Sequence, residues 1–180
     1  MWLPESDKFR DHLLRLDRED RRMRFGMAVT DEFINDYTSR LEETRGVVYG
    51  FFAGGEMHAA AEMRLLGDAW STDAEGAFSV ERAYQNRGIG TDLLGRIIRA
   101  ARNRNVQRLY MNCLAENHKM QRLCRKYQAD LHFDHGEVVG RVLPALPTYI
   151  SIWEEAVDDS NGFVMAVLDL PRAVMPSPYH

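Results

Sequence analysis

The chain has 180 residues, of which 45% are hydrophobic and 28% charged, and its formal net charge is −4. This length favours a single domain, and this composition is ordinary for a soluble globular protein with a buried core. The negative net charge argues against general nucleic-acid binding, because nucleic-acid-binding proteins normally present a basic face. No apolar run approaches the roughly 20 residues that span a membrane. The N-terminus shows no pattern of a secretory signal, so we expect a cytoplasmic protein.

Cysteine and histidine spacing indicates neither a metal site nor a triad. Cys113 and Cys124 lie eleven residues apart, without cysteine or histidine partners at the spacing of metal ligands. We therefore expect reduced thiols and no metal. Four histidines lack the spacing to serine or aspartate that is typical of a catalytic triad, so we do not expect a hydrolase. They are His58, His118, His132 and His135.

The N-terminal half changes from helical to strand periodicity. Apolar spacing predicts a helix over 7–16 and another over about 31–43, with the charged run 17–22 ending or interrupting the first helix. Three strands follow, joined first by a Gly54-Gly55 hairpin turn, and they should form an antiparallel meander. These strands are expected over 46–53, 56–66 and 76–81.

The second half begins with the clearest amphipathic helix in the chain, which starts near Ile89. It links the strand over 76–81 to a strand over 106–114, and such a unit requires parallel strands with a right-handed crossover. A helix over 117–127 and a hairpin over 131–143 complete the pattern. Antiparallel and parallel pairs together make the fold class α+β.

A proline-bracketed tail follows this domain. We therefore divide the chain into a domain over 1–143 and a C-terminal extension over 144–180. The extension should hold a short helix after Pro144 and an apolar strand over 163–168. It should pack on the core or on another subunit, which is compatible with a homodimer.

A glycine-rich stretch, "YQNRGIGTDLL", lies between an expected strand and the helix that follows it. Amides at a helix N-terminus lack partners within the helix and carry partial positive charge, and glycines let a bulky anion approach them. Phosphate is the usual anion at such a site. The stretch lacks the Gly-Lys-Ser/Thr ending of a P-loop and the third glycine of a dinucleotide fingerprint. The residues alone therefore leave open a phosphate site and a structural turn.

The same stretch carries a family resemblance. Residues 85–90, "QNRGIG", resemble the Q/R-x-x-G-x-G/A signature of the GNAT acyltransferase superfamily, and they follow a strand end of the form V-x-x-x-[YW] from Val80 to Tyr84. The later segment "LAENHKMQRLCRK" is similar to the corresponding segment of the bacterial protein-lysine acetyltransferase branch. The resemblance covers roughly 46–143 and implies the GNAT fold, a mixed and mostly antiparallel sheet flanked by helices.

This resemblance implies that acetyl-CoA is the acyl donor. Its pyrophosphate would rest on the amides of the glycine loop, and its pantetheine arm would pair with the strand edge that leads into the loop. The N–H group of Val80 would hold the thioester carbonyl oxygen as negative charge develops there. The implied donor contacts are Phe78, Ser79, Val80, Gln85, Asn86, Arg87, Gly88, Ile89, Gly90, Thr91 and Asn117.

Acetyl transfer to an amine also needs groups that move protons. A lysine amine has a pKa of about 10, so a base must remove its proton before attack. Glu75 resembles the glutamate of an "AE-x-A" motif in the same branch and is the expected base, with Glu62 and Glu81 as alternatives that depend on strand register. Cys124 stands where many members have a tyrosine acid. Tyr127 is the candidate acid, with core packing as the alternative role for both residues.

The implied function is an N-acetyltransferase that moves an acetyl group directly from acetyl-CoA to a primary amine, either a protein lysine or a small molecule. A non-catalytic acyl-CoA sensor on the same fold is the alternative, and the missing tyrosine favours it slightly. A third interpretation is an interaction protein that uses Trp153 and the strand over 163–168. We expect no nucleic-acid or membrane partner.

Overall fold

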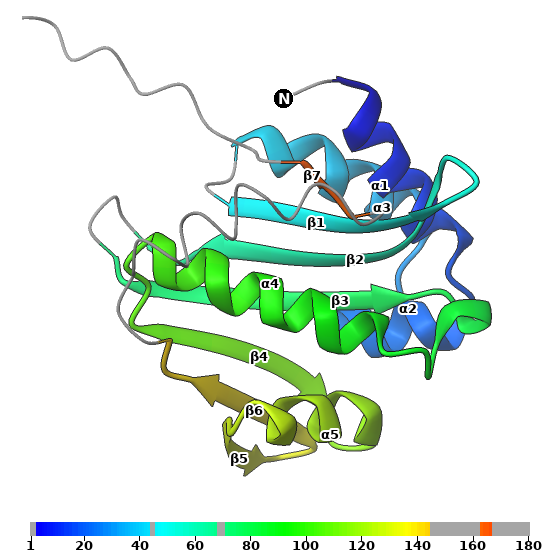
Figure 1. Cartoon of the computed structure of the whole chain (residues 1–180). Helices are drawn as coiled ribbons and strands as arrows, with labels where there is room; N and C mark the ends of the chain where they lie inside the picture. The colour runs from blue at the N-terminus through cyan, green and yellow to red at the C-terminus, as the bar shows by residue number, and fades with distance from the viewer. Residues whose placement is uncertain (1–2, 44–45, 68–70, 145–162, 167–180) are drawn as a thin grey trace, which may run out of the picture.

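The computed structural model describes residues 3–43, 46–67, 71–144 and 163–166. Its strands form one sheet in the order β5-β6-β4-β3-β2-β1-β7, and helices cover both faces (Figure 1). The helices are α1 (Leu3–Arg15), α2 (Arg18–Phe25), α3 (Asp31–Ser39), α4 (Ile89–Asn103) and α5 (His118–Lys126), with short 3-10 turns at Arg40–Glu43 and Arg82–Tyr84. The strands are β1 (Gly46–Ala53), β2 (Glu56–Leu65), β3 (Asp73–Val80), β4 (Arg108–Leu114), β5 (Asp130–Asp134), β6 (Glu137–Val142) and β7 (Phe163–Ala166).

The charged run after α1 forms a helix that hydrophobic periodicity did not predict. Asp17 caps α2, because its carboxylate accepts hydrogen bonds from the backbone N–H groups of Glu19 and Asp20 at 3.0 and 2.8 Å. Gly26 closes α2 in the left-handed conformation, with φ 74°. Acidic residues in the first turn and arginines in the last complement the helix dipole. Capping and charge thus specify α2, and the expectation that this run only interrupts a helix was incomplete.

The sheet confirms the predicted meander and the parallel crossover. β1 pairs with β2 and β2 with β3, both antiparallel, and β3 pairs with β4 in parallel after the α4 crossover. In the described strands, β3 and β4 pair only from Asp73 to Glu75 on β3, opposite Arg108 to Tyr110 on β4. Beyond Glu75 the two strands part, so the C-terminal half of β3 has an edge that β4 does not cover.

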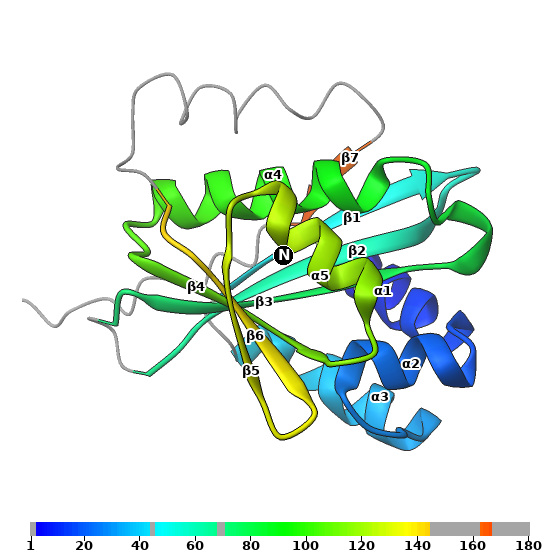
Figure 2. The same ribbon diagram turned by 90° about the horizontal axis from the view of Figure 1, so that it is seen from below.

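Two apolar layers hold the helices against the sheet. α4 and α5 lie on one face, and α1, α2 and α3 lie on the other (Figure 2). On the first face Leu93, Leu94 and Ile97 of α4 are fully buried against the sheet. On the second face Leu13 of α1 and Ile34 of α3 are fully buried. Removal of such side chains from water is the main favourable term that holds the two layers to the sheet.

Part of the C-terminal extension joins the sheet of this chain. The strand predicted over 163–168 is found as β7, which pairs antiparallel with β1 from Val48 to Phe51. Trp153 and the helix expected after Pro144 lie outside the described residues. None of the helices in the described ranges is both long and apolar enough to cross a membrane.

Candidate active site

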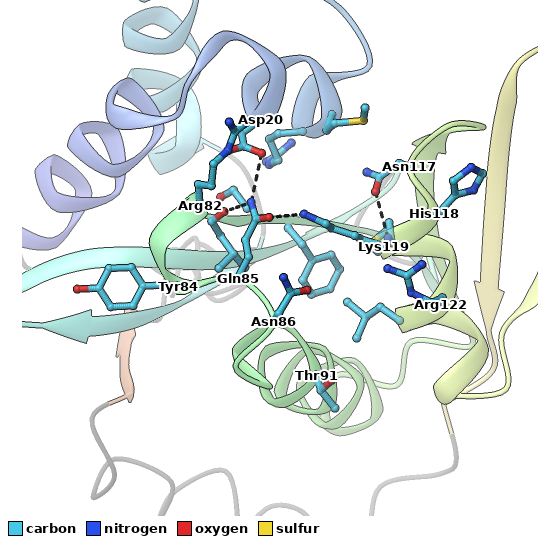
Figure 3. A pocket seen from close by; sticks show the side chains of 18 of the residues that line it. Asp20, Arg82, Tyr84, Gln85, Asn86, Thr91, Asn117, His118, Lys119 and Arg122 are labelled. Atoms are coloured by element: carbon cyan, nitrogen blue, oxygen red, sulfur yellow. Dashed lines mark hydrogen bonds and ion pairs between the residues drawn. The ribbon is translucent and has the colours of Figure 1, made fainter.

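A cavity of about 870 Å³ lies between α2, the end of β3, the first turn of α4 and α5. Phe78, Ser79 and Val80 line it from β3, and Leu16, which follows α1, and Met23 of α2 line it from the second face of the sheet. The glycine loop and α5 complete its wall (Figure 3). The cavity therefore borders β3 on both faces of the sheet.

The uncovered edge of β3 presents backbone groups to this cavity. The N–H of Glu81 donates to the carbonyl of His58 on β2 at 2.9 Å, whereas the carbonyl of Val80 accepts from the Gln85 side chain at 2.9 Å on the opposite side. Backbone groups alternate along a strand, so the N–H groups of Phe78 and Val80 also face away from β2. An extended ligand can add to such an edge as a further strand would.

The glycine loop opens the N-terminus of α4 toward the same cavity. Gly88 precedes the helix with φ 86°, and Asn86 also has a positive φ of 59°. A Cβ atom at Gly88 would meet no atom within 4 Å, so the left-handed backbone, and not lack of space, favours glycine there. The N–H groups of Thr91 and Asp92 donate to the Gly88 carbonyl at 2.9 and 3.1 Å, so the amides of Ile89 and Gly90 are the ones that a ligand could use, at a helix end with partial positive charge.

α5 adds cations to the wall that faces this helix end. Lys119, Arg122 and Lys126 all line the cavity. The Lys119 ammonium donates to the side-chain oxygen of Gln85, whose amide donates to the Asp20 carboxylate at 3.2 Å (Figure 3). Gln85 therefore ties the loop to α2 and to α5. Backbone amides at a helix N-terminus beside three cations suit a bound anion such as a pyrophosphate.

Comparison with known proteins decides the family. The model of the family described as "Acetyltransferase (GNAT) family" matches residues 10–129. The chain belongs to the GNAT family of acetyltransferases. The predicted GNAT fold and the assignment to the acyltransferases are thereby confirmed, and acetyl-CoA is the acyl donor of the family.

Solved GNAT structures share this fold. The GNAT domain of S. lividans PAT is 22% identical with a TM-score of 0.68, and the match covers 78% of this chain and 86% of that one. A cAMP-binding acyltransferase from Mycobacterium smegmatis is 25% identical with a TM-score of 0.54, over 79% of this chain and 44% of that one. The structure of yncA from Salmonella typhimurium with its cofactor acetyl-CoA is 18% identical with a TM-score of 0.53, over 79% and 87%.

Most of the predicted donor contacts line the cavity of this GNAT domain. Arg87 and Ile89 are the exceptions: the Arg87 guanidinium lies over the Tyr84 ring, 5.3 Å from its centroid, and Ile89 packs into the α4 core. Asn117 lines the cavity while its side-chain oxygen caps α5 by accepting from the N–H of Met120 at 3.1 Å. The predicted contacts that line the cavity are Phe78, Ser79, Val80, Gln85, Asn86, Gly88, Gly90, Thr91 and Asn117.

Cys124 of α5 and Tyr127 at the end of that helix are not among the described residues that line the cavity. The Tyr127 hydroxyl donates to the backbone carbonyl of Thr91 at 2.8 Å. It lies so close to Gly95 that a Cβ atom there would be 2.8 Å from the hydroxyl oxygen. Cys124 is buried, and this burial raises the pKa of its thiol to about 12. Such a thiol is a weak acid.

Glu75 lies on the second face of the sheet, at the point where β3 and β4 part. Its two carboxylate oxygens are held by Asn112 at 3.0 Å and by Arg64 at 3.3 Å. Its side chain is 28% exposed, so water can reach it, although Glu75 is absent from the described residues that line the cavity. The structure thus separates the predicted base from the predicted donor contacts.

A partly buried ion-pair network connects Glu75 to the cavity. Arg24, which lines the cavity, lies 2.8 Å from Glu62, and Glu62 lies 3.3 Å from Arg64, which also pairs with Glu75. Tyr37 donates to Glu62 at 2.5 Å, and burial is the main cause that raises the pKa of Tyr37 to about 12. Arg24 and Tyr37 thus both donate to Glu62 Oε2, whereas the buried Oε1 accepts no hydrogen bond from the described residues and has only the ion pair with Arg64. No sequence pattern indicates this network, because its members come from α2, α3, β2 and β3.

Both carboxylate oxygens of Glu81, the other alternative base, have donors beside them. His12 and His58 lie 3.1 and 2.7 Å from its two carboxylate oxygens, and Arg15 lies 3.0 Å away. Burial alone would raise the pKa of Glu81, but the hydrogen bonds from the two histidines and the charge of Arg15 outweigh burial and lower it to about 2. A carboxylate with so low a pKa is a poor proton acceptor near neutral pH.

Proposed function

We propose that the protein transfers an acetyl group from acetyl-CoA to a primary amine, a protein lysine or a small-molecule amine, by direct attack of the amine on the thioester. One observation carries this proposal: a single cavity reaches the N-terminus of α4, the uncovered edge of β3 and the α2 side of the sheet. The first two features suit a donor that has a pyrophosphate and an extended arm. The third leaves room for an acceptor on the other side of β3.

The residues of the cavity fit such a donor. The first amides of α4, together with Lys119, Arg122 and Lys126, would hold the pyrophosphate. The N–H groups of Phe78 and Val80 would pair with the amide-containing arm, and Val80 would also stabilise the oxyanion. Bound acetyl-CoA supplies the activated carbonyl, so the protein has to orient the two substrates and move two protons.

Carboxylates on the α2 side would meet a cationic acceptor. Glu19 and Asp20 line the cavity from α2, and Glu116 lines it from the turn before α5. All three pair with arginines, since Arg22 lies near Glu19 and Glu116, and Arg82 lies near Asp20. A protonated amine could replace an arginine as their partner, so we propose these carboxylates as the groups that would bind it near β3.

For the base, we propose Glu75 acting through water. Its carboxylate lies on the acceptor face and is held by Asn112 and Arg64. Its partial exposure supports a water path from the cavity, and Arg24 and Glu62 extend the polar connection. For the acid, we propose water in place of Tyr127, because the Tyr127 hydroxyl already donates to Thr91. The catalytic unit we propose is 1–143, with the extension adding β7 to the sheet.

The test is calorimetric titration with acetyl-CoA, with desulfo-CoA and adenosine diphosphate as controls, followed by a screen of amines that measures release of CoA thiol. We expect saturable binding and amine-dependent release. No binding at millimolar acetyl-CoA would refute the proposal. Binding without turnover across lysine peptides and small amines would favour the acyl-CoA sensor. Two observations are compatible with that alternative: the Tyr127 hydroxyl already donates to Thr91, and the Cys124 thiol is buried.

A further inference from the structure

Ser79, His12 and Glu81 form a hydrogen-bonded row beside the cavity that the proposed amine transfer does not use. Ser79 Oγ lies 2.8 Å from His12 Nε2, and His12 Nδ1 lies 3.1 Å from Glu81 Oε1. This is the order and spacing of a nucleophile, a base and an orienting acid in a Ser–His–acid triad. Its members come from α1, from β3 and from the residue after β3, so the histidine spacings that argued against a hydrolase did not detect it.

The partners of Glu81 fix the protonation of His12. Glu81 stays ionised because His58 and Arg15 donate to it as well as His12. The His12 Nδ1 atom must therefore carry a proton in order to donate to this carboxylate. Complete burial of His12 is the main cause that lowers its pKa, so the ring is neutral and its Nε2 accepts the Ser79 hydroxyl proton. A neutral histidine in this tautomer can act as a base toward serine.

Ser79 also lies where a donor carbonyl would be held. It stands between Phe78 and Val80, whose N–H groups face the uncovered edge, and all three residues line the cavity. Its side chain points toward α1, and the cavity is also lined on that side, by Leu16 and Met23. A carbonyl bound to the β3 edge would therefore have the Ser79 hydroxyl beside it.

We infer that Ser79 is a nucleophile that takes the acetyl group from acetyl-CoA when no amine is bound, so that the protein also hydrolyses acetyl-CoA; this inference rests on the proposed function, because both need the same donor site. The Ser79 Oγ–C bond forms, the hydroxyl proton passes to His12 Nε2, and the C–S bond breaks as the CoA thiolate takes that proton. Water then attacks the acetyl ester and gives a proton to His12. The C–Oγ bond breaks, Oγ takes the proton back, and acetate leaves.

Acid quenching of the full chain with acetyl-CoA, in the absence of amine, tests this step by intact mass and peptide mapping. We expect one acetyl group on the peptide that contains Ser79, together with continuous release of CoA thiol. Ser79→Ala should remove the adduct and lower this release at least about a hundredfold. It should still bind acetyl-CoA, because the donor contacts of β3 are backbone groups. Ser71→Ala is the matched control, since Ser71 is not among the described residues that line the cavity.

A second substitution covers the case in which Ser79→Ala does not fold because His12 loses its partner. Ser79→Cys keeps a nucleophile at this position and should accumulate a stable acetyl thioester. The inference would be overturned if residue 79 carried no acetyl group and Ser79→Ala released CoA thiol without amine as fast as the unsubstituted protein. If that protein still bound acetyl-CoA and transferred acetyl to amines, the proposed function would stand. Absence of acetyl-CoA binding in the unsubstituted protein would overturn both.

Discussion

Gly88 is the position at which one added charge tests the donor site most directly. Its φ is 86°, and a Cβ atom there would meet no atom within 4 Å. A side chain at this position would therefore be strained by the left-handed backbone, at about 1–2 kcal/mol, without a steric clash. Gly88→Gln and Gly88→Glu share this strain and nearly the same size, and they differ by one negative charge.

The magnitude follows from the short distance between this position and the proposed pyrophosphate site. Two unit charges about 5 Å apart at an effective dielectric constant of about 20 interact with roughly 3 kcal/mol. Since about 1.4 kcal/mol is a tenfold change in Kd, Gly88→Glu should bind acetyl-CoA at least roughly a hundredfold more weakly than Gly88→Gln. Gly88→Gln should itself bind more weakly than the unsubstituted protein, because bulk enters the approach path of the anion.

Calorimetric titration of both variants with acetyl-CoA, at low and at high salt, measures this difference. Urea unfolding should give both variants similar free energies of unfolding, so that binding is compared between equally folded proteins. High salt should narrow the gap between the variants, because it screens the repulsion. Equal affinities of the two folded variants would refute the placement of the pyrophosphate at this loop.

Three further substitutions test the proton chemistry and the packing. Glu75→Gln should leave acetyl-CoA affinity unchanged and lower kcat/KM for the amine about 10²–10⁴-fold near neutral pH; an unaltered pH–rate profile would assign the base elsewhere. The pKa of Glu81 is about 2 in the folded protein against an ordinary value of 4.5, so its stabilisation is complete above about pH 4.5 and is lost as pH falls toward 2. Glu81→Gln should therefore flatten the free energy of unfolding over that window, and an unchanged acid slope would contradict the pairing. Gly95→Ala should destabilise the protein by about 1–3 kcal/mol in urea unfolding, because the new methyl group displaces the Tyr127 hydroxyl; recovery of part of this loss by added Tyr127→Phe would support that cause, and no loss would exclude it.

The features that could be predicted from the sequence are those that short stretches of the chain determine. The meander, the crossover helix and the glycine loop depend on residues close together in the chain, such as the Gly54-Gly55 turn and the apolar stripe that begins at Ile89. α2 was missed because it has no buried residue, and without an apolar stripe only Asp17 and Gly26 mark its ends. Capping residues therefore carried information that periodicity did not.

The candidate site was predictable only where backbone geometry defines it. The motif located the strand edge and the loop, because these contacts need a particular backbone and not particular partners. Contacts between side chains from distant elements were not predictable: His12 meets Ser79 across 67 positions of the chain, and Arg24 meets Glu62 across 38. Such pairs depend on how α1 and α2 pack on the sheet, and a local sequence pattern does not predict this packing.

The alternation of β3 explains why donor contacts and proton-transferring groups separate so cleanly. Phe78 and Val80 pack their side chains toward α4 and turn their N–H groups to the uncovered edge. Glu75, Ser79 and Glu81 point their side chains to the opposite face, where they meet Arg64, His12 and His58. Both alternations have a period of two, so a register shift of one residue against β2 would reverse them together. It would remove the open N–H groups from the cavity and bury carboxylates in the α4 core, so β2–β3 pairing is a condition for the proposed chemistry as well as for the fold.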